Sequence, residues 1–329
     1  MSKESSFTEA IRQALAEEME SDSTVFLLGE DIAAYGGAFG VTKGLLERFG
    51  AERVVNTPIS EGGFIGMSVG AAMTGLRPVA EIMFMDFIAL ASDQLINQAA
   101  KLHYIFGEQA RCPMVIRTPG GAGKRYGPTH SQSLEAWFMH VPGLKIVAPS
   151  TPADAKGLLK SAIRDDNPVL FLESKGLYNI RGPVPEQDDS AVPLGKARQV
   201  CEGEDLTIIA WSRMAYEAEA AVRELRKSGV TAELLDLRTL NPMDMHAITD
   251  SACKTGRVLI VDEATGTCGI SAEIMARLFE QAFDYLDAPV RRLTGCAAPV
   301  CASPPLEDAA LPDHQKIIDA AIDLVEWGL

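Results

Sequence analysis

Apolar positions along the chain follow two patterns, short apolar runs of strand length and longer segments with a helical period. The first helical segment is clearly marked, because Ser6-Phe7-Thr8-Glu9 forms a capping box ahead of one apolar face. Helices are predicted over residues 7–19, 41–49, 62–72, 87–106, 130–141, 151–164, 215–227, 272–281 and 317–325. Strands are predicted over residues 25–28, 53–57, 79–84, 114–117, 145–148, 169–173, 206–210, 232–236 and 257–262.

Strands alternate with helices in both halves of the chain, a pattern typical of α/β folds with mainly parallel sheets. Between the halves, residues 181–195 combine prolines and a small acidic cluster with almost no periodicity. We therefore predict two α/β domains, residues 1–183 and residues 197–329, joined by a linker over residues 184–196.

The segment 62–72 consists almost entirely of Gly, Ala and apolar residues, and Glu61 stands directly before it. Such a helix favours burial and close approach of other backbone. Glu61 has two interpretations. An acid in the first turn complements the helix dipole, whereas a buried acid with a raised pKa can share a proton with a ligand nitrogen.

His130 follows the glycine-rich loop 118–123 and stands at a predicted helix start. A helix N-terminus keeps a nearby imidazole neutral, and a neutral imidazole can relay protons. The alternative is a loop histidine that Ser131 or Ser133 satisfies. We expect no catalytic role for the remaining histidines, which are His103, His140, His246 and His314.

Met83, Phe84 and Phe87 come just after a predicted strand, where α/β proteins place ligands, although such residues more often belong to the core. The glycine loops lack the GxGxxG spacing of dinucleotide sites, and the chain has no Walker A sequence and no GxSxG elbow.

Composition narrows the class of protein. The chain has 329 residues, 47% of them hydrophobic and 23% charged, which suits a soluble two-domain protein. A net charge of −15 argues against nucleic acid as a partner. The absence of a long apolar run argues against a membrane, and we expect a cytoplasmic protein of bacterial type or, after removal of a targeting segment, one of the mitochondrial matrix. The 6 cysteines show no metal-binding spacing and are expected to be reduced.

Several motifs occur in an order that is more specific than any one of them. They are Thr57-Pro58-Ile59-Ser60-Glu61, Asp93-Gln94 through Asn97, His130-Ser131-Gln132-Ser133, Pro142-Gly143-Leu144-Lys145 and Asp154 through Leu159. This series resembles the β subunit of the thiamine-diphosphate-dependent first component of 2-oxo acid dehydrogenase complexes, a family with pyruvate, acetoin and branched-chain members. The resemblance covers essentially the whole chain.

The resemblance implies a pyrimidine-binding domain followed by a transketolase-type C-terminal domain. It also implies a tetramer of two α and two β chains that binds thiamine diphosphate at the α–β interface. Glu61 matches the glutamate that hydrogen-bonds N1′ of the aminopyrimidine, which favours the buried-acid interpretation. Phe87 matches the aromatic residue on the pyrimidine ring, and Ile59 and Met83 match positions beside it. His130 matches the histidine that assists reaction with the lipoyl group.

The same resemblance implies two metal ions, K⁺ and Mg²⁺. The family has a potassium site whose ligands match the main-chain oxygens of Met114, Ala162 and Ile163 together with Asp165 and Asn167, although Asp and Asn are also common where a helix ends in a turn. The cofactor's diphosphate needs Mg²⁺ held by a GDG motif, and this chain has no GDG. In the family that half of the site lies on the α subunit, so we expect the chain to be inactive alone.

The sequence thus predicts an oxidoreductase subunit that, with its α subunit, decarboxylates pyruvate or cleaves acetoin and transfers the acyl group to a lipoyl domain of the acyltransferase core. Phe87 favours these members over branched-chain ones, which tend to carry Tyr there. Three alternatives stay open: a branched-chain enzyme, a non-catalytic assembly subunit that docks the acyltransferase core, and a self-contained transketolase-like enzyme. The missing GDG motif disfavours the last of these.

Overall fold

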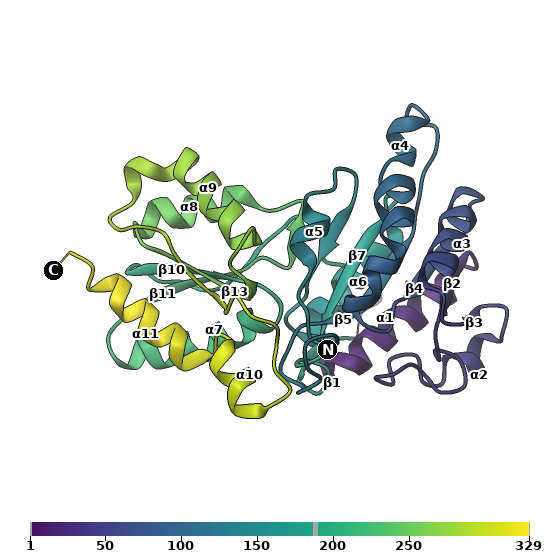
Figure 1. Ribbon diagram of the computed structural model, residues 1–329, viewed down its shortest axis with the longest axis horizontal. Coiled ribbons are helices and arrows are strands. Elements are labelled where there is room, and N and C mark those ends of the chain that lie inside the picture. The colour runs from purple at the N-terminus through teal and green to yellow at the C-terminus, as the bar shows by residue number, and fades with distance from the viewer. Residues whose placement is uncertain (1, 187–189, 329) are drawn as a thin grey trace. The chain divides into compact units, whose positions relative to one another are not determined.

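The computed structural model describes residues 2–186 and 190–328 and divides into two compact units (Figure 1). Unit 1 comprises Met1–Gly120 and Trp137–Leu194, and unit 2 comprises Gly121–Ala136 and Gly195–Leu329. Each unit is built on its own mostly parallel sheet. The predicted α/β class with two parallel-sheet domains is confirmed.

Unit 1 has a parallel sheet, in which each of the strands named below runs parallel to its neighbours. The order is β6 (Lys145–Val147), β7 (Val169–Ser174), β5 (Val115–Gly120), β4 (Arg77–Glu81), β2 (Val25–Gly29) and β3 (Val54–Asn56). Helices α1 (Phe7–Ser21) and α6 (Pro152–Arg164) pack against each other. The predicted capping box at Ser6 and the Thr151 cap of α6 are both present.

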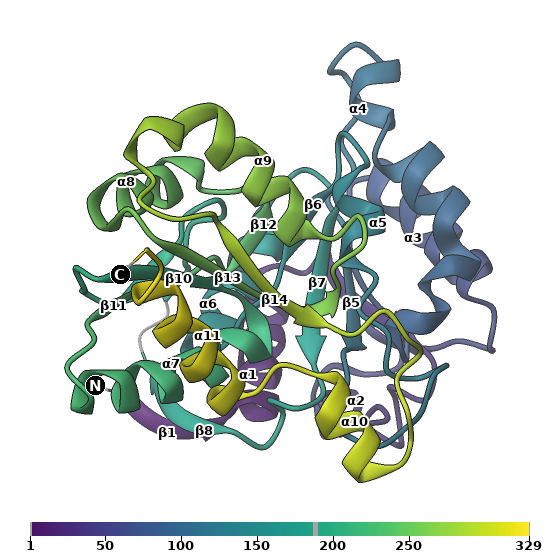
Figure 2. The same ribbon diagram turned by 60° about the vertical axis from the view of Figure 1, so that its left-hand side comes forward.

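Unit 2 has a second sheet, seen from another side in Figure 2, in which only the edge strand β9 is antiparallel to its neighbour. The order is β14 (Arg291–Gly295), β13 (Val258–Thr265), β10 (Leu206–Ala210), β11 (Ala232–Asp236) and β9 (Arg198–Cys201). Helices α8 (Met245–Thr255) and α9 (Ile270–Ala282) cover one face, and α7 (Ser212–Lys227) and α11 (His314–Val325) cover the other (Figure 1).

Three predicted helices differ from the structure. Residues 87–106 form a 3₁₀ helix η1 (Met85–Ala91), a π-helix η2 (Gln94–Ala99) and the short α4 (Leu102–Ile105) instead of one α-helix. The first of these pieces approaches the glycine-rich helix before them closely, because a Cβ on Gly62 would lie 3.0 Å from the Leu90 carbonyl oxygen. The helix predicted over 41–49 is reduced to α2 (Leu45–Phe49), since Gly44 adopts a left-handed conformation with φ of 83°. The helix predicted from residue 130 begins only at Glu135, as α5 (Glu135–Met139).

The boundary between the two units is more complex than one linker. The first predicted linker residues belong to β8 (Arg181–Pro185), which pairs with β1 (Ser2–Ser6), and Val192 exchanges hydrogen bonds with α6 through Gly157 and Ser161. Residues 187–189 of the predicted linker lie outside the described residues. In addition, residues 121–136 group with unit 2 although they lie between two strands of unit 1. The two units therefore cannot be separated at one position in the sequence, because each consists of two segments of chain.

Within the ranges described, no helix is both long enough and apolar enough to cross a bilayer. All of the cysteines there are free thiols, and only Cys112 is buried.

A buried ionic cluster joins three neighbouring strands of unit 1. Arg117 on β5, only 1% exposed, donates to Glu173 on β7 at 2.7 and 2.9 Å and to Glu81 on β4 at 2.7 Å. The Tyr178 hydroxyl donates to the same Glu173 carboxylate at 2.7 Å. Since two carboxylates share one guanidinium away from water, the cluster holds the carboxyl ends of these strands in register.

Replacing Arg117 with Ala is expected to lower the free energy of unfolding by about 3–5 kcal/mol, because it leaves buried carboxylates without a partner charge. Urea unfolding followed by circular dichroism measures the change. Arg223→Ala is the matched control, since Arg223 pairs with Glu219 on the surface and its side chain is 71% exposed. Equal unfolding midpoints for the two variants would contradict a structural role for the cluster.

Candidate active site

Glu61 begins helix α3 (Glu61–Met73) and is only 5% exposed. It follows β3, and Ser60 at the N-cap makes no side-chain capping bond. One face of α3 is buried through Phe64, Ile65 and Val69. The opposite face is exposed yet carries Gly63, Met67, Gly70 and Met73, so the helix is apolar on its outer side as well.

Glu30 lies in the same region and was not among the predicted site residues. It comes directly after β2, is 5% exposed, and its Oε1 atom has no hydrogen-bond partner among the described residues. Burial, with the neighbouring charges of Glu61, Asp31 and Glu81, raises the pKa of Glu30 to about 6. The signal in the sequence was an acidic residue directly after an apolar strand.

A cluster of aromatic side chains lies just after β4, on the same edge of the sheet. The Phe84 and Phe87 rings meet edge to face with centroids 5.9 Å apart, and Phe39 contacts Phe84 at 5.7 Å. The ammonium of buried Lys175 lies 5.3 Å from the centre of the Phe84 ring. Phe87 and Met83 are partly buried, whereas Ile59 on the loop before α3 is 82% exposed.

These side chains follow the carboxyl ends of β2, β3 and β4, the edge where parallel α/β sheets bind ligands. They combine carboxylate oxygens, aromatic faces and flexible apolar side chains. That set fits a flat basic heteroaromatic ring: the rings and thioethers pack on its faces, and a carboxyl group exchanges a proton with its nitrogen. The unpartnered oxygen of Glu30 and the exposed Ile59 agree with a site completed by other groups.

His130 belongs to unit 2 and lies in a turn ahead of α5, so the prediction of a helix start at this residue was wrong. Its Nδ1 atom lies 3.0 Å from the Thr129 hydroxyl. The neighbouring Thr129 and Ser131 line a cavity of about 550 Å³ that Gly295 to Val300 also line. The Thr129 hydroxyl therefore contacts the imidazole, and no helix begins at His130.

Two buried acids lie near this cavity, on α5 and β13. Burial, with the charges of Asp262 and Glu263, raises the pKa of Glu135 to about 8. Burial also raises the pKa of Asp262 to about 6.

The histidines expected to be non-catalytic include His246 and His314, which lie beside the acids Asp250 and Glu217.

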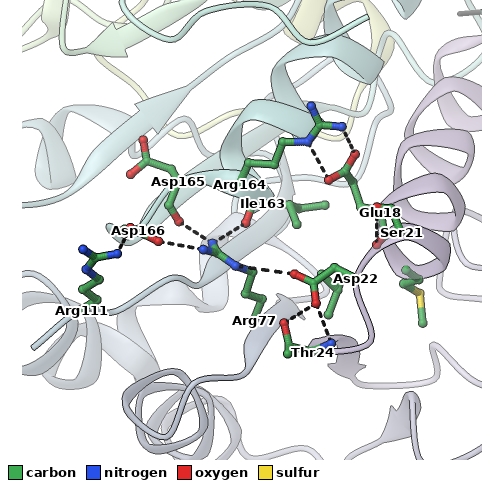
Figure 3. A network of polar contacts seen from close by, with 12 residues as sticks. Glu18, Ser21, Asp22, Thr24, Arg77, Arg111, Ile163, Arg164, Asp165 and Asp166 are labelled. Atoms are coloured by element: carbon green, nitrogen blue, oxygen red, sulfur yellow. Dashed lines mark hydrogen bonds and ion pairs between the residues drawn. The ribbon is translucent and has the colours of Figure 1, made fainter. Parts of the chain in front are cut away.

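Two of the residues predicted to bind potassium, Ile163 and Asp165, lie at the end of α6 beside Arg77 (Figure 3). Arg77 Nη1 donates to the carbonyl oxygens of Ile163 and Asp165 at 2.9 and 3.0 Å. The Asp165 carboxylate accepts from Lys145 and Asn167, and these bonds outweigh burial, which acts the other way, so that the pKa of Asp165 is lowered.

The remaining predicted ligands also have donors, because the Met114 carbonyl accepts from Val169 and the Ala162 carbonyl from Asp165. Each carbonyl oxygen keeps a second lone pair, and an all-oxygen set suits a hard cation. Over the described ranges, no group of three or more His, Cys, Asp or Glu residues is arranged to hold a metal.

Comparison with known protein families matches both units. The transketolase pyrimidine-binding domain model matches residues 3–181, and the transketolase C-terminal domain model matches residues 195–317. The pyruvate dehydrogenase E1 component subunit beta of Rhizobium meliloti is 49% identical, covering 95% of this chain and 68% of that protein. The acetoin:2,6-dichlorophenolindophenol oxidoreductase subunit beta of Bacillus subtilis is 46% identical, covering 99% of this chain and 98% of that protein.

This chain belongs to the β subunits of the 2-oxo acid dehydrogenase family. The resemblance seen in the ordered motifs is thereby confirmed. Related β subunits include a mitochondrial one from Dictyostelium discoideum, which is 45% identical over 97% of this chain and 90% of that protein.

Solved structures show the same fold for this β subunit. A split-gene transketolase described as an inactive beta4 tetramer superposes with a TM-score of 0.78 at 21% identity, covering 97% of each chain. A transketolase from Pichia stipitis superposes with a TM-score of 0.72 at 14% identity, covering 97% of this chain and 45% of that one.

Replacing Glu30 with Gln is expected to stabilise the β subunit above about pH 6 by up to roughly 2 kcal/mol, because the variant has no buried carboxylate to ionise. The folded pKa is raised from 4.5 to about 6, so the gain shrinks as pH falls through this window and disappears below it. Thermal unfolding at about pH 8 and about pH 5 tests the sign. Glu47→Gln removes an exposed charge and is the control, and a gain that did not depend on pH would contradict the assignment.

Proposed function

We propose that this β subunit supplies the pyrimidine half of a thiamine diphosphate site and forms the active oxidoreductase only with an α subunit. The observation that carries the proposal is the buried Glu61 at the start of α3, on the sheet edge that also presents Met83 and Phe87. The family assignment supports the same cofactor.

When bound, thiamine diphosphate would supply a nucleophilic carbon to bond to the substrate's carbonyl carbon and a cationic ring to take up the electron pair released when the adjacent carbon–carbon bond breaks. Glu61 holds a proton at the pyrimidine N1′ atom, and Phe87, Met83 and Ile59 pack against the ring. Glu30, with its raised pKa, is a second proton-holding group beside Glu61. His130 gives a proton to the sulfur released when the acyl group moves to the lipoyl disulfide.

The outer face of α3 supports the need for a partner. Met67 is 51% exposed, Met73 is 46% exposed and Leu90 on η1 is 65% exposed, so exposed apolar side chains lie along the helix that Glu61 begins and on the neighbouring η1. Exposed apolar surface of this kind marks an interaction site. We infer that the α subunit covers it and brings the Mg²⁺ and its GDG motif, giving a tetramer of two α and two β chains.

The names of the relatives and the identity of one residue, Phe87, support the choice of substrate. Relatives named for pyruvate and for acetoin are both represented at 44–49% identity, and Phe87 suits these groups better than the branched-chain one. We therefore propose pyruvate or acetoin as substrate and a lipoyl domain of the acyltransferase core as acceptor. We infer that the complex works in a bacterial-type cytoplasm or in the mitochondrial matrix.

A non-catalytic assembly subunit is the alternative function. The net charge of −15 suits docking to a basic domain of the acyltransferase core. Such a subunit has no need of a buried carboxylate beside an aromatic pocket, so variants of Glu61 and His130 separate the two functions.

Glu61→Ala is expected to lower turnover at least about 100-fold in the assembled complex, because the proton at the ring nitrogen loses its partner. Turnover is measured as thiamine-diphosphate-dependent reduction of an artificial electron acceptor with pyruvate, acetoin or a branched-chain 2-oxo acid. Glu61→Gln keeps a hydrogen-bonding group but not the carboxyl group and should be nearly as slow.

The same assay without the α subunit tests the half-site, for which no turnover is expected. Near-normal turnover of the Glu61 variants would favour the assembly function. Turnover of the β subunit alone would favour a self-contained transketolase-like enzyme.

We also propose that the oxygens of Met114, Ala162, Ile163, Asp165 and Asn167 bind K⁺. Potassium should then raise the free energy of unfolding by up to about 2.7 kcal/mol at a hundredfold excess over Kd. The midpoint of thermal unfolding should accordingly be higher in potassium than in sodium of equal ionic strength. Asp165→Asn should remove the difference, whereas Asp166→Asn should keep it, since the Asp166 carboxylate pairs with Arg77 and Arg111 and is not among the proposed ligands. Identical midpoints in both salts would rule out the site.

A further inference from the structure

The segment that carries His130 is anchored in unit 2. Residues 121–136 leave β5 and return to unit 1 at Trp137, yet they group with the second unit. Two glutamates of unit 2 accept hydrogen bonds from the backbone of this segment. They are Glu263 on β13 and Glu307 on α10 (Pro304–Ala310).

Glu263 binds the start of the segment. Its Oε1 atom accepts from the Ala122 amide at 2.5 Å, and its Oε2 atom accepts from Arg213 Nε at 2.9 Å. The carboxylate reaches this position because residue 121 is glycine: a Cβ there would lie 2.9 Å from Glu263 Oε1, and the backbone has φ of 78°.

Glu307 binds the next residue of the segment and is completely buried. Its Oε1 atom accepts from the Gly123 amide at 2.9 Å, and its Oε2 atom accepts from Arg125 Nη1 at 2.5 Å. Arg125 also pairs with Asp308 at 2.7 Å. A buried carboxylate bound by a backbone amide and a guanidinium is a strong and directional contact.

The anchored residues are linked to the histidine through the backbone. The Gly121 amide donates to the Gln132 carbonyl at 3.1 Å, which closes the segment around His130. The His130 amide lies 3.4 Å from the Gly127 carbonyl oxygen. A shift at Ala122 or Gly123 is therefore passed to both sides of His130.

We propose that Glu263 and Glu307 are positioning residues that fix this segment and thereby hold the His130 imidazole for acyl transfer. The inference rests on the proposed function of His130. In that transfer the acyl carbon bonds to one sulfur of the disulfide and is oxidised from the aldehyde level. The S–S bond breaks, its electron pair passes to the second sulfur, and that sulfur takes one proton, which His130 delivers.

The first test measures the anchor without any catalysis. Hydrogen–deuterium exchange is followed over residues 121–136 in the assembled α–β complex without thiamine diphosphate. Glu263→Ala and Glu307→Ala should each speed exchange in this segment at least about tenfold, because the amides of Ala122 and Gly123 lose their buried acceptors. Glu280→Gln, an exposed acid of α9, is the matched control and should leave exchange unchanged.

The second test compares two assays on the loaded complex. Reductive acylation of a lipoyl domain should fall about 10- to 100-fold in the two Ala variants, as expected when a reacting group is misplaced by about 1 Å. Reduction of an artificial electron acceptor, which needs no lipoyl thiol, should change less than about threefold. The fall should appear in kcat and not in KM for the lipoyl domain. Glu307→Gln keeps an acceptor for Gly123 and should recover most of the rate.

The outcomes separate the inference from the proposed function. If His130→Ala slows neither assay, the role of His130 is wrong, while exchange still reports on the anchor. If His130→Ala slows only acylation but both Ala variants behave like wild type, the inference is wrong. An equal fall in both assays would show a general structural role and also overturn it. Should the Ala variants fail to fold, Arg125→Ala changes a partly exposed residue, removes its contacts with Glu307 and Asp308, and must show the same selective loss.

Discussion

Burial of charge at the carboxyl ends of parallel strands is the constraint on which unit 1 depends. Arg117 alone bridges Glu81 and Glu173 between three strands, while Glu30 and Glu61 are buried at the same edge. Burial is the main cause of the raised pKa of Glu30, and the neighbouring carboxylates of Glu61, Asp31 and Glu81 raise it further. An edge of this kind is suited to exchanging protons with a basic ring, because one of its acids is ready to hold a proton near neutral pH.

The same edge explains why the β subunit is half of an enzyme. The small residues of α3 allow η1 to approach closely, and they leave an outer face without polar side chains beside Glu61. A face of this kind is stable in water only at a cost in exposed apolar area. A partner that covers it removes that cost and, in our proposal, brings the groups that bind the diphosphate.

Unit 2 contributes differently, by holding a piece of chain that the sequence places between strands of unit 1. The buried carboxylates of Glu263 and Glu307 satisfy backbone amides of a glycine-rich segment that has no regular structure of its own. A loop bound in this way loses conformational freedom at its anchored residues, and the histidine it carries gains a defined position.

The sequence by itself determined the α/β class, most strands, the capping box at Ser6 and the family, because these depend on local periodicity, local caps and the order of short motifs. It also singled out Glu61 through the contrast between one acid and an apolar helix. It could not find Glu30 as a site residue, the 3₁₀ and π windings after β4, or the true start of the helix after His130. Those features arise from contacts between residues far apart in the chain: the carboxylate cluster, the approach of Leu90 to Gly62, and the binding of residues 121–136 to unit 2. Only the tertiary structure decides them, since burial and pairing of charge depend on which elements meet, and a local pattern carries no record of that.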